Sequence, residues 1–197
     1  MVRLFVLCVV LCVLATTIAV PEENPEAAKK PTYEPSKTLI AVLPTVLKSA
    51  ESAAQSQNAK EEAQKMLAED FSERGFQIVA KDKLSDICAK RKFDPLDSEC
   101  LTKESLAGVG AEAGAALVAY ATLQSFNSEL RNMAVVKVKV LDVQTQTYVV
   151  NETRKAENDK LRKKGRMVAL HRAIENALDD FFKPYKAIKT DEQSKEN

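Results

Sequence analysis

The order in which strand-like and helix-like apolar patterns follow one another most constrains the fold of this chain. Residues 38–47 (TLIAVLPTVL) form a nearly continuous apolar run with β-branched side chains, which is typical of a strand buried on both faces, and Pro44 should mark its end. Apolar residues then recur at helical spacing from Ala59 to Phe71, which predicts an amphipathic helix that stops at Gly75. Such an alternation favours a sheet covered by helices.

The same alternation continues to the end of the sequence. In the segment 133–143, valines alternate with Lys137 and Lys139, so that strand should expose one face to water. We therefore predict a single α/β (α+β) domain with one mixed sheet of about five strands and three to four helices, in the order βαβααβββα. Its later elements are expected at 76–80 (strand), 81–90 and 101–113 (helices), 115–126, 133–143 and 147–153 (strands), and 167–181 (helix).

The N-terminus has the layout of a secretory signal peptide. A single basic residue, Arg3, precedes an apolar run over residues 4–14, and mostly small residues follow that run. We therefore expect residues 1–19 to be removed by cleavage between Ala19 and Val20. Residues 20–37 are rich in proline and charge and predict a disordered tether. Residues 186–197 have nothing to bury and predict a disordered tail, which leaves 38–185 as the domain.

Charge and hydropathy narrow the class of protein. The chain has 29 Lys and Arg against 28 Asp and Glu, and the signal peptide removes one base, so the mature protein has no net charge. A nucleic-acid partner is therefore not expected, because its usual electrostatic footprint is missing. No stretch after the signal is long and apolar enough to predict a transmembrane span.

The cysteines suggest one structural feature. Cys8 and Cys12 would leave with the signal peptide, whereas Cys88 and Cys100 form an even pair in a chain bound for an oxidising compartment. This predicts a disulfide between them, and the alternative is two free buried thiols. A zinc site is not expected with these cysteines, because His171 is the only histidine that could join them.

No other pattern predicts catalysis or a cofactor. His171 falls on or beside the apolar stripe of the last helix, where a packed or boundary role is expected. The glycines at 108, 110 and 114 lie between a helix and a strand, the reverse of a dinucleotide fingerprint, and should let the helix end and the strand begin. The carboxylate pairs are expected to be solvated helix surface: Glu61 and Glu62, Glu69 and Asp70, Asp179 and Asp180.

Four segments resemble an extracytoplasmic bacterial domain, that of the TolB N-terminal domain, LpoB and CsgG. They are LIAVLP (39–44), GFQIV (75–79), GVGAEAGAALVAYATL (108–123) and VKVLDVQTQTYV (138–149). The sequence departs from that group in two ways. Gln146 stands where the last hairpin usually has glycine, and neither Cys8 nor Cys12 follows the small residues of a lipoprotein cleavage box.

These observations and the resemblance together predict an exported, non-enzymatic interaction or accessory domain in bacterial envelope assembly or secretion. It should be periplasmic or secreted, without a lipid anchor and without a cofactor. Its partner should be another envelope or secreted protein, bound at a sheet edge or at the face carrying Lys137 and Lys139, and a homo-oligomer is compatible with this. The alternative is a small exported thiol-dependent or ligand-binding protein that uses Cys88 or Cys100.

Overall fold

The computed structural model describes residues 32–48, 53–127, 132–158 and 163–185. It contains one six-stranded mixed sheet with the order β3-β1-β4-β5-β6, in which β2 also pairs with β4. The predicted fold class is therefore confirmed. The elements are η1 Pro35–Lys37, β1 Leu39–Val42, β2 Val46–Leu47, α1 Ala53–Ser72, β3 Gln77–Ile78, α2 Lys81–Lys90, α3 Lys103–Ala113, β4 Leu117–Asn127, β5 Asn132–Asp142, β6 Thr147–Asn158 and α4 Lys163–Phe182.

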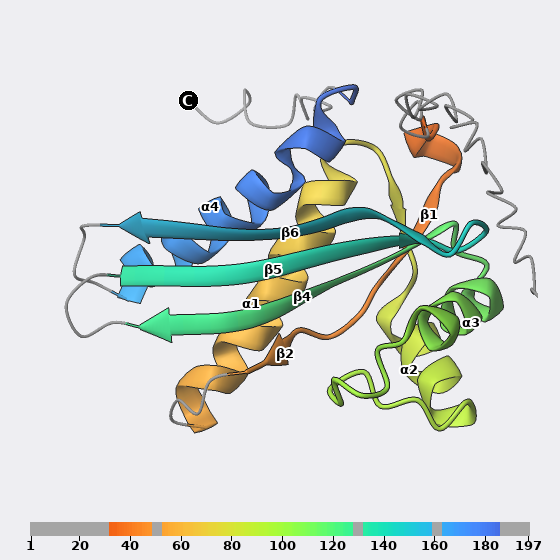
Figure 1. Ribbon diagram of the computed structural model, residues 1–197, viewed down its shortest axis with the longest axis horizontal. Coiled ribbons are helices and arrows are strands. Elements are labelled where there is room, and N and C mark those ends of the chain that lie inside the picture. The colour runs from red at the N-terminus through yellow and green to blue at the C-terminus, as the bar shows by residue number, and fades with distance from the viewer. Residues whose placement is uncertain (1–31, 49–52, 128–131, 159–162, 186–197) are drawn as a thin grey trace, which may run out of the picture. The chain divides into compact units, whose positions relative to one another are not determined.

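The sheet has a parallel half and an antiparallel half that meet at β4. β1 is parallel to both β3 and β4, with Ile40 opposite Ile78 on one side and Leu117 on the other. The single run expected over 38–47 is divided into β1 and β2 around Pro44, which cannot donate a ladder hydrogen bond. β4, β5 and β6 form a long antiparallel ribbon, hereafter the β4–β6 ribbon (Figure 1).

Helices cover the two faces of the sheet unequally. α1 and α4 lie side by side behind the β4–β6 ribbon, whereas α2 and α3 lie on the opposite side at one end of it (Figure 1). The larger core fills the first interface, where the alternate valines of β5 pack under α4 and phenylalanines from α1 and α4 cluster. The smaller core joins α2 and α3 to β1 and to the beginning of β4. No described helix is long and apolar enough to cross a membrane.

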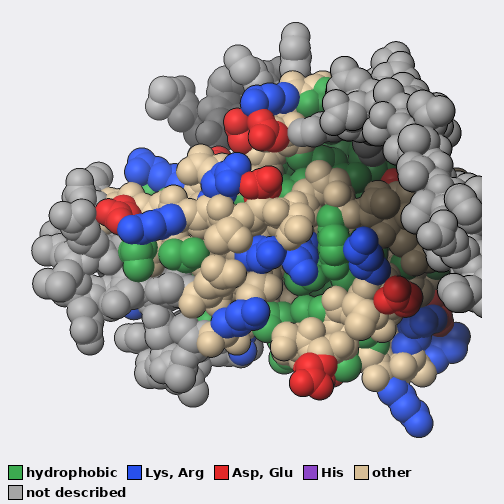
Figure 2. Space-filling view, viewed as in Figure 1, with side chains coloured by type: hydrophobic (Ala, Val, Ile, Leu, Met, Phe, Trp, Pro, Cys, Tyr) green, Lys and Arg blue, Asp and Glu red, His purple; other side chains and the backbone are tan. Residues whose placement is uncertain are grey.

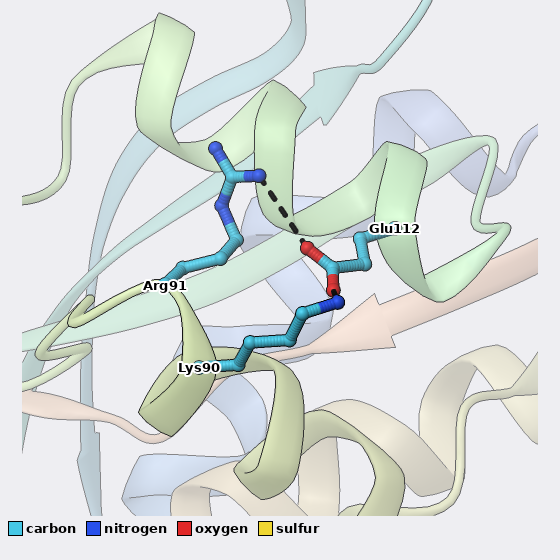
Figure 3. A network of polar contacts seen from close by, with 3 residues as sticks. All are labelled: Lys90, Arg91 and Glu112. Carbon is cyan, nitrogen blue, oxygen red and sulfur yellow. Dashed lines mark hydrogen bonds and ion pairs between the residues drawn. The ribbon is translucent and has the colours of Figure 1, made fainter.

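A polar network ties α2 to α3 at the surface. Glu112 accepts a hydrogen bond of 2.7 Å from Lys90 and lies 3.5 Å from the Arg91 guanidinium group (Figure 3). The hydrogen bond from Lys90 is the main cause of the lowered pKa of Glu112. Both partners stand at the C-terminal end of α2, so the network fixes that end against α3.

The glycines after residue 107 differ from expectation. Gly114 does end α3, with a φ of +73°, but Gly108 and Gly110 lie inside that helix. A side chain at Gly110 would collide with Val118 of β4 and Val143, so this glycine lets α3 approach the sheet closely. The expectation that all three glycines separate helix from strand was wrong for the first two.

The domain begins before residue 38. The backbone N–H of Tyr33 donates a hydrogen bond of 2.8 Å to the Tyr185 hydroxyl group, and the Tyr33 ring lies against Phe181. Residues 32–37 therefore belong to the folded unit, which corrects the tether expected over 20–37 at its C-terminal end. The predicted cleavage between Ala19 and Val20 and the predicted tail 186–197 lie outside the described residues.

Candidate functional site

The candidate site is the face of the β4–β6 ribbon that points away from α1 and α4, because among the described helices only α2 and α3 cover it, at one end. Strand alternation sends Val136, Val138 and Val140 of β5 into the core under α4. Lys137 and Lys139 therefore point to the opposite face, as the sequence predicted for a strand with one wet side. Figure 2 shows this face, with Lys and Arg side chains gathered over the middle of the ribbon.

Each lysine is flanked by neighbours from both adjoining strands. Lys139 pairs in register with Tyr120 of β4 and with Asn151 of β6. Its ammonium group lies 5.6 Å from the centre of the Tyr120 ring and 5.0 Å from that of the Tyr148 ring, within the range of cation–π attraction. We call the surface formed by Tyr120, Lys137, Lys139 and Tyr148 the lysine–tyrosine face.

Two more lysines extend the positive charge of this face. Lys103 of α3 lies 5.4 Å from the Tyr148 ring, on the side where the smaller helical layer begins. Partial burial lowers the pKa of Lys139, and the nearby charges of Lys137 and Lys48 lower it further. Within the described ranges, no ion pair is formed by Lys48, Lys103, Lys137 or Lys139.

The two tyrosines lie beside Lys139, and Tyr148 also lies beside Lys103. Tyr120 is 2% exposed, and burial together with a hydrogen bond to Tyr148 raises its pKa well above the usual range. The Tyr120 phenol therefore stays neutral at physiological pH, and its ring lies beside the ammonium group of Lys139. The sequence suggested the lysines by alternation, but the tyrosines come from two other strands and were missed.

The cysteines do not form the predicted disulfide. Cys88 and Cys100 are free: Cys88 is buried in the smaller core, and the thiol of partly exposed Cys100 lies 3.4 Å from Oδ2 of Asp97. Burial raises the pKa of Cys88, and the hydrogen bond to Asp97 is the main cause of the raised pKa of Cys100. Arg91 and Lys92 line a hollow with Cys100, yet neither thiol has the lowered pKa of a reactive cysteine.

Two adjoining hollows lie where β1 and β3 end. The larger has a volume of about 470 Å³ and the smaller about 290 Å³, and both are lined by Gln64 and Lys81. Gln64 donates a hydrogen bond of 3.0 Å to the main-chain oxygen of Val42, which fixes the position of its side chain. Cys88 lines the smaller hollow. The carboxyl ends of parallel strands are common binding positions in α/β sheets.

A polar contact joins α1 and α4 behind the sheet. Asp70 of α1 was expected on a solvated surface with Glu69, but it is 2% exposed and lies against His171 of α4. The two residues are 101 positions apart, so no local pattern could have paired them. Burial raises the pKa of Asp70 to about 6, despite the opposing hydrogen bond to His171.

Comparison with known proteins relates the chain to others through its structure alone. No protein-family model and no curated protein matches the sequence. Among solved structures, lipoprotein GNA1162 from Neisseria meningitidis superposes with a TM-score of 0.54 at 13% identity, over 73% of this chain and 97% of that one. The two proteins share a fold.

Two further solved structures are similar to the chain. The LpoB C-terminal domain from Escherichia coli matches with a TM-score of 0.48 at 19% identity, over 64% of this chain and 87% of that domain. The corresponding domain from Salmonella enterica matches with a TM-score of 0.43 at 16% identity, over 65% and 86%. The superposition on GNA1162 confirms the predicted resemblance at the level of the fold.

Proposed function

We propose that this chain is an extracytoplasmic, non-enzymatic accessory domain that binds an acidic surface of another envelope protein through the lysine–tyrosine face. The observation that carries the proposal is a sheet face that no described helix covers in full, with lysines that have no acidic partner among the described residues. The rings of Tyr120 and Tyr148 lie beside Lys139 and restrict its side chain, so less side-chain freedom is lost when a carboxylate binds it. Tyrosine is also enriched at the centres of protein interfaces.

The shared fold supports the location in this proposal. GNA1162 is a lipoprotein, and the N-terminal pattern of the present chain predicts export. The prediction that the present chain has no lipid anchor stays a prediction, because Cys8 and Cys12 lie outside the described residues. Intact-mass measurement of the native protein distinguishes a chain that begins at Val20 from one that carries a diacylglyceryl cysteine.

Site-specific photo-crosslinking in the native envelope tests the binding face. A photoreactive amino acid placed at Asn151 or Thr153, both exposed on β6 beside the lysines, should capture one envelope protein reproducibly. The same group at Glu62, exposed on α1, is the matched control and should not capture it. Equal capture from both surfaces, or capture from neither, would contradict the proposal.

Charge reversal then tests the chemistry of the contact. The double variant Lys137→Glu and Lys139→Glu should abolish the crosslink, and the milder Lys137→Gln and Lys139→Gln variant should weaken it. Lys65→Glu changes an exposed lysine of α1 by the same charge and should have no effect. Circular dichroism and thermal unfolding of each variant establish that the domain is still folded.

A second candidate function is binding of a small ligand in the two hollows where β1 and β3 end. Their combined polar and apolar lining, with Gln64 and Lys81 shared between them, favours this alternative over thiol chemistry at Cys88. Ligand-dependent increases in melting temperature that disappear in a Gln64→Ala variant would support it. If a ligand screen gives no such increase, the interaction domain remains the stronger proposal.

A further inference from the structure

Three potential metal ligands from α1 and α4 converge behind the sheet. His171 and Glu175 stand four residues apart on α4 and therefore share a helix face, and Asp70 of α1 lies opposite them. One ligand atom from each side chain can be chosen so that all three lie within 4.8 Å of one another. This cluster lies on the opposite side of the sheet from the lysine–tyrosine face.

The Asp70 carboxylate lacks the partners that a buried charge needs. Its side chain is 3% exposed, Oδ1 lies 3.3 Å from Nε2 of His171, and buried Oδ2 has no hydrogen-bond partner among the described residues. A buried carboxylate is costly unless it is paired or coordinates a metal. Arg74 does not fill this role, because its guanidinium group donates to the main-chain oxygen of Asp70 and stacks on Phe182.

One of the ligand distances already suits a tetrahedral ion. With metal–nitrogen and metal–oxygen bonds of about 2.0–2.1 Å, two ligands of a tetrahedral ion lie about 3.3–3.4 Å apart. The separation between Asp70 and His171 is 3.3 Å, and that between Nε2 of His171 and Oε1 of Glu175 is 3.9 Å. Glu175 is half exposed, so its side chain can close the remaining gap by a change of rotamer.

We propose that Asp70, His171 and Glu175 bind one Zn²⁺ ion that links α1 to α4. An imidazole nitrogen with two carboxylate oxygens suits zinc better than calcium or magnesium, which prefer oxygen ligands alone. The half-exposed ring of His171 gives the ion a path from solvent, and a water molecule completes the four ligands. The ion supplies the positive charge that the buried carboxylate of Asp70 lacks.

The proposed ion clamps the two helices that cover the larger core. Asp70 precedes Phe71 of that core, and His171 follows Leu170, so both ligands are attached to its buried stripes. Zinc should therefore stabilise the whole domain without touching the lysine–tyrosine face. This inference is independent of the proposed function, and either can fail without the other.

Zinc titration of the mature protein tests the site. The protein must carry no polyhistidine tag, since His171 is the only histidine in the sequence and its imidazole resonances in an NMR spectrum then report on this site alone. We expect saturable binding of one Zn²⁺ per chain by calorimetry, a rise in melting temperature, and a shift of the His171 resonances. Cobalt(II) in place of zinc should give the visible absorption of a four-coordinate ion.

Variants of the ligands decide between coordination and surface binding. His171→Ala and Glu175→Gln should each weaken zinc binding at least about tenfold, since even loss of a supporting partner costs that much. Both side chains are partly exposed, so these variants should fold. Glu62→Gln, an exposed carboxylate elsewhere on α1, is the control and should bind as the parent does. Absence of saturable binding, or equal binding by parent and His171→Ala, would overturn the proposal.

Discussion

The hydroxyl group of Tyr33 donates a hydrogen bond of 2.8 Å to Oδ2 of Asp142, across 109 positions of sequence. The bond joins the segment before β1 to the turn between β5 and β6. Asp142 also accepts, at Oδ1, hydrogen bonds from the N–H and hydroxyl groups of Thr145. One carboxylate thus closes the turn and holds the beginning of the domain against it.

Replacing Asp142 should make stability less sensitive to acid. Burial alone would raise the pKa of Asp142, but its hydrogen bonds outweigh burial and leave the pKa below the usual value. A lowered pKa in the folded state adds stability above the unfolded value of about 3.9, and this stability is lost as the pH falls through the folded value. Asp142→Asn should therefore unfold about 2 kcal/mol more easily at pH 7, the worth of hydrogen bonds to a charged group.

Urea unfolding at pH 7 and at about pH 2.5 measures this effect, and the difference between parent and Asp142→Asn should shrink at the lower pH. Tyr33→Phe removes one of the donors and should cost about 1–2 kcal/mol at pH 7. A difference between parent and Asp142→Asn that stays constant with pH would contradict the assignment.

Replacing Gln146 with glycine should stabilise the domain. Gln146 has a φ of +53° in the turn between β5 and β6, a conformation that costs a residue with a side chain about 1–2 kcal/mol. Glycine avoids this cost but loses more backbone entropy on folding, so we expect a net gain of up to about 1 kcal/mol in the free energy of unfolding. Gln144→Gly, two residues earlier in the same turn, should destabilise instead, and denaturant unfolding of both variants checks the contrast.

Replacing Asp70 with asparagine should stabilise the metal-free protein. The variant removes a buried charge, one oxygen of which has no partner among the described residues. In the presence of a chelator we expect its free energy of unfolding to rise by about 1 kcal/mol. The exposed neighbour Glu69→Gln should change stability very little. A lower stability of Asp70→Asn would mean that the carboxylate is already well compensated without metal.

Reducing agents should leave the stability of the protein unchanged. Cys88 and Cys100 are free thiols with raised pKa values, so there is no bridge to break and little thiolate to react near pH 7. Thermal unfolding with and without dithiothreitol should agree, and alkylation of the folded protein should be slower than that of the denatured chain. A melting temperature that falls on reduction would show that the cysteines pair.

Periodicity predicted most of the elements, because each apolar pattern reflects which face of an element is buried. The expected and observed limits of α2 agree at both Lys81 and Lys90. β6 runs on to Asn158, beyond its expected end at Thr153, because pairing with β5 rather than its own composition determines its length. The sequence correctly placed a break at Pro44. It did not predict that β2 pairs with β4 after this break, because a strand of two residues is too short to show a pattern.

The candidate sites were less predictable, since they depend on contacts between distant elements. The alternation of valine and lysine within β5 was enough to place Lys137 and Lys139 on the candidate binding face. Tyr120 and Tyr148 reach the same face only through the register of three strands. Asp70 carries a charge that normally predicts exposure, and only the packing of α4 against α1 buries it.

The parallel pairing of β1 determines when during synthesis this sheet can form. β1 is made first, yet its neighbours are β3 and β4, and the second of these ends at Asn127. By contrast, β4, β5, β6 and α4 follow one another directly along the chain. A chain that emerges N-terminus first must therefore carry the apolar strand β1 without its central partner β4 until most of its length has been translated. Contacts between elements close in sequence form sooner, so the C-terminal half is expected to fold first and to serve as the template on which β1 docks.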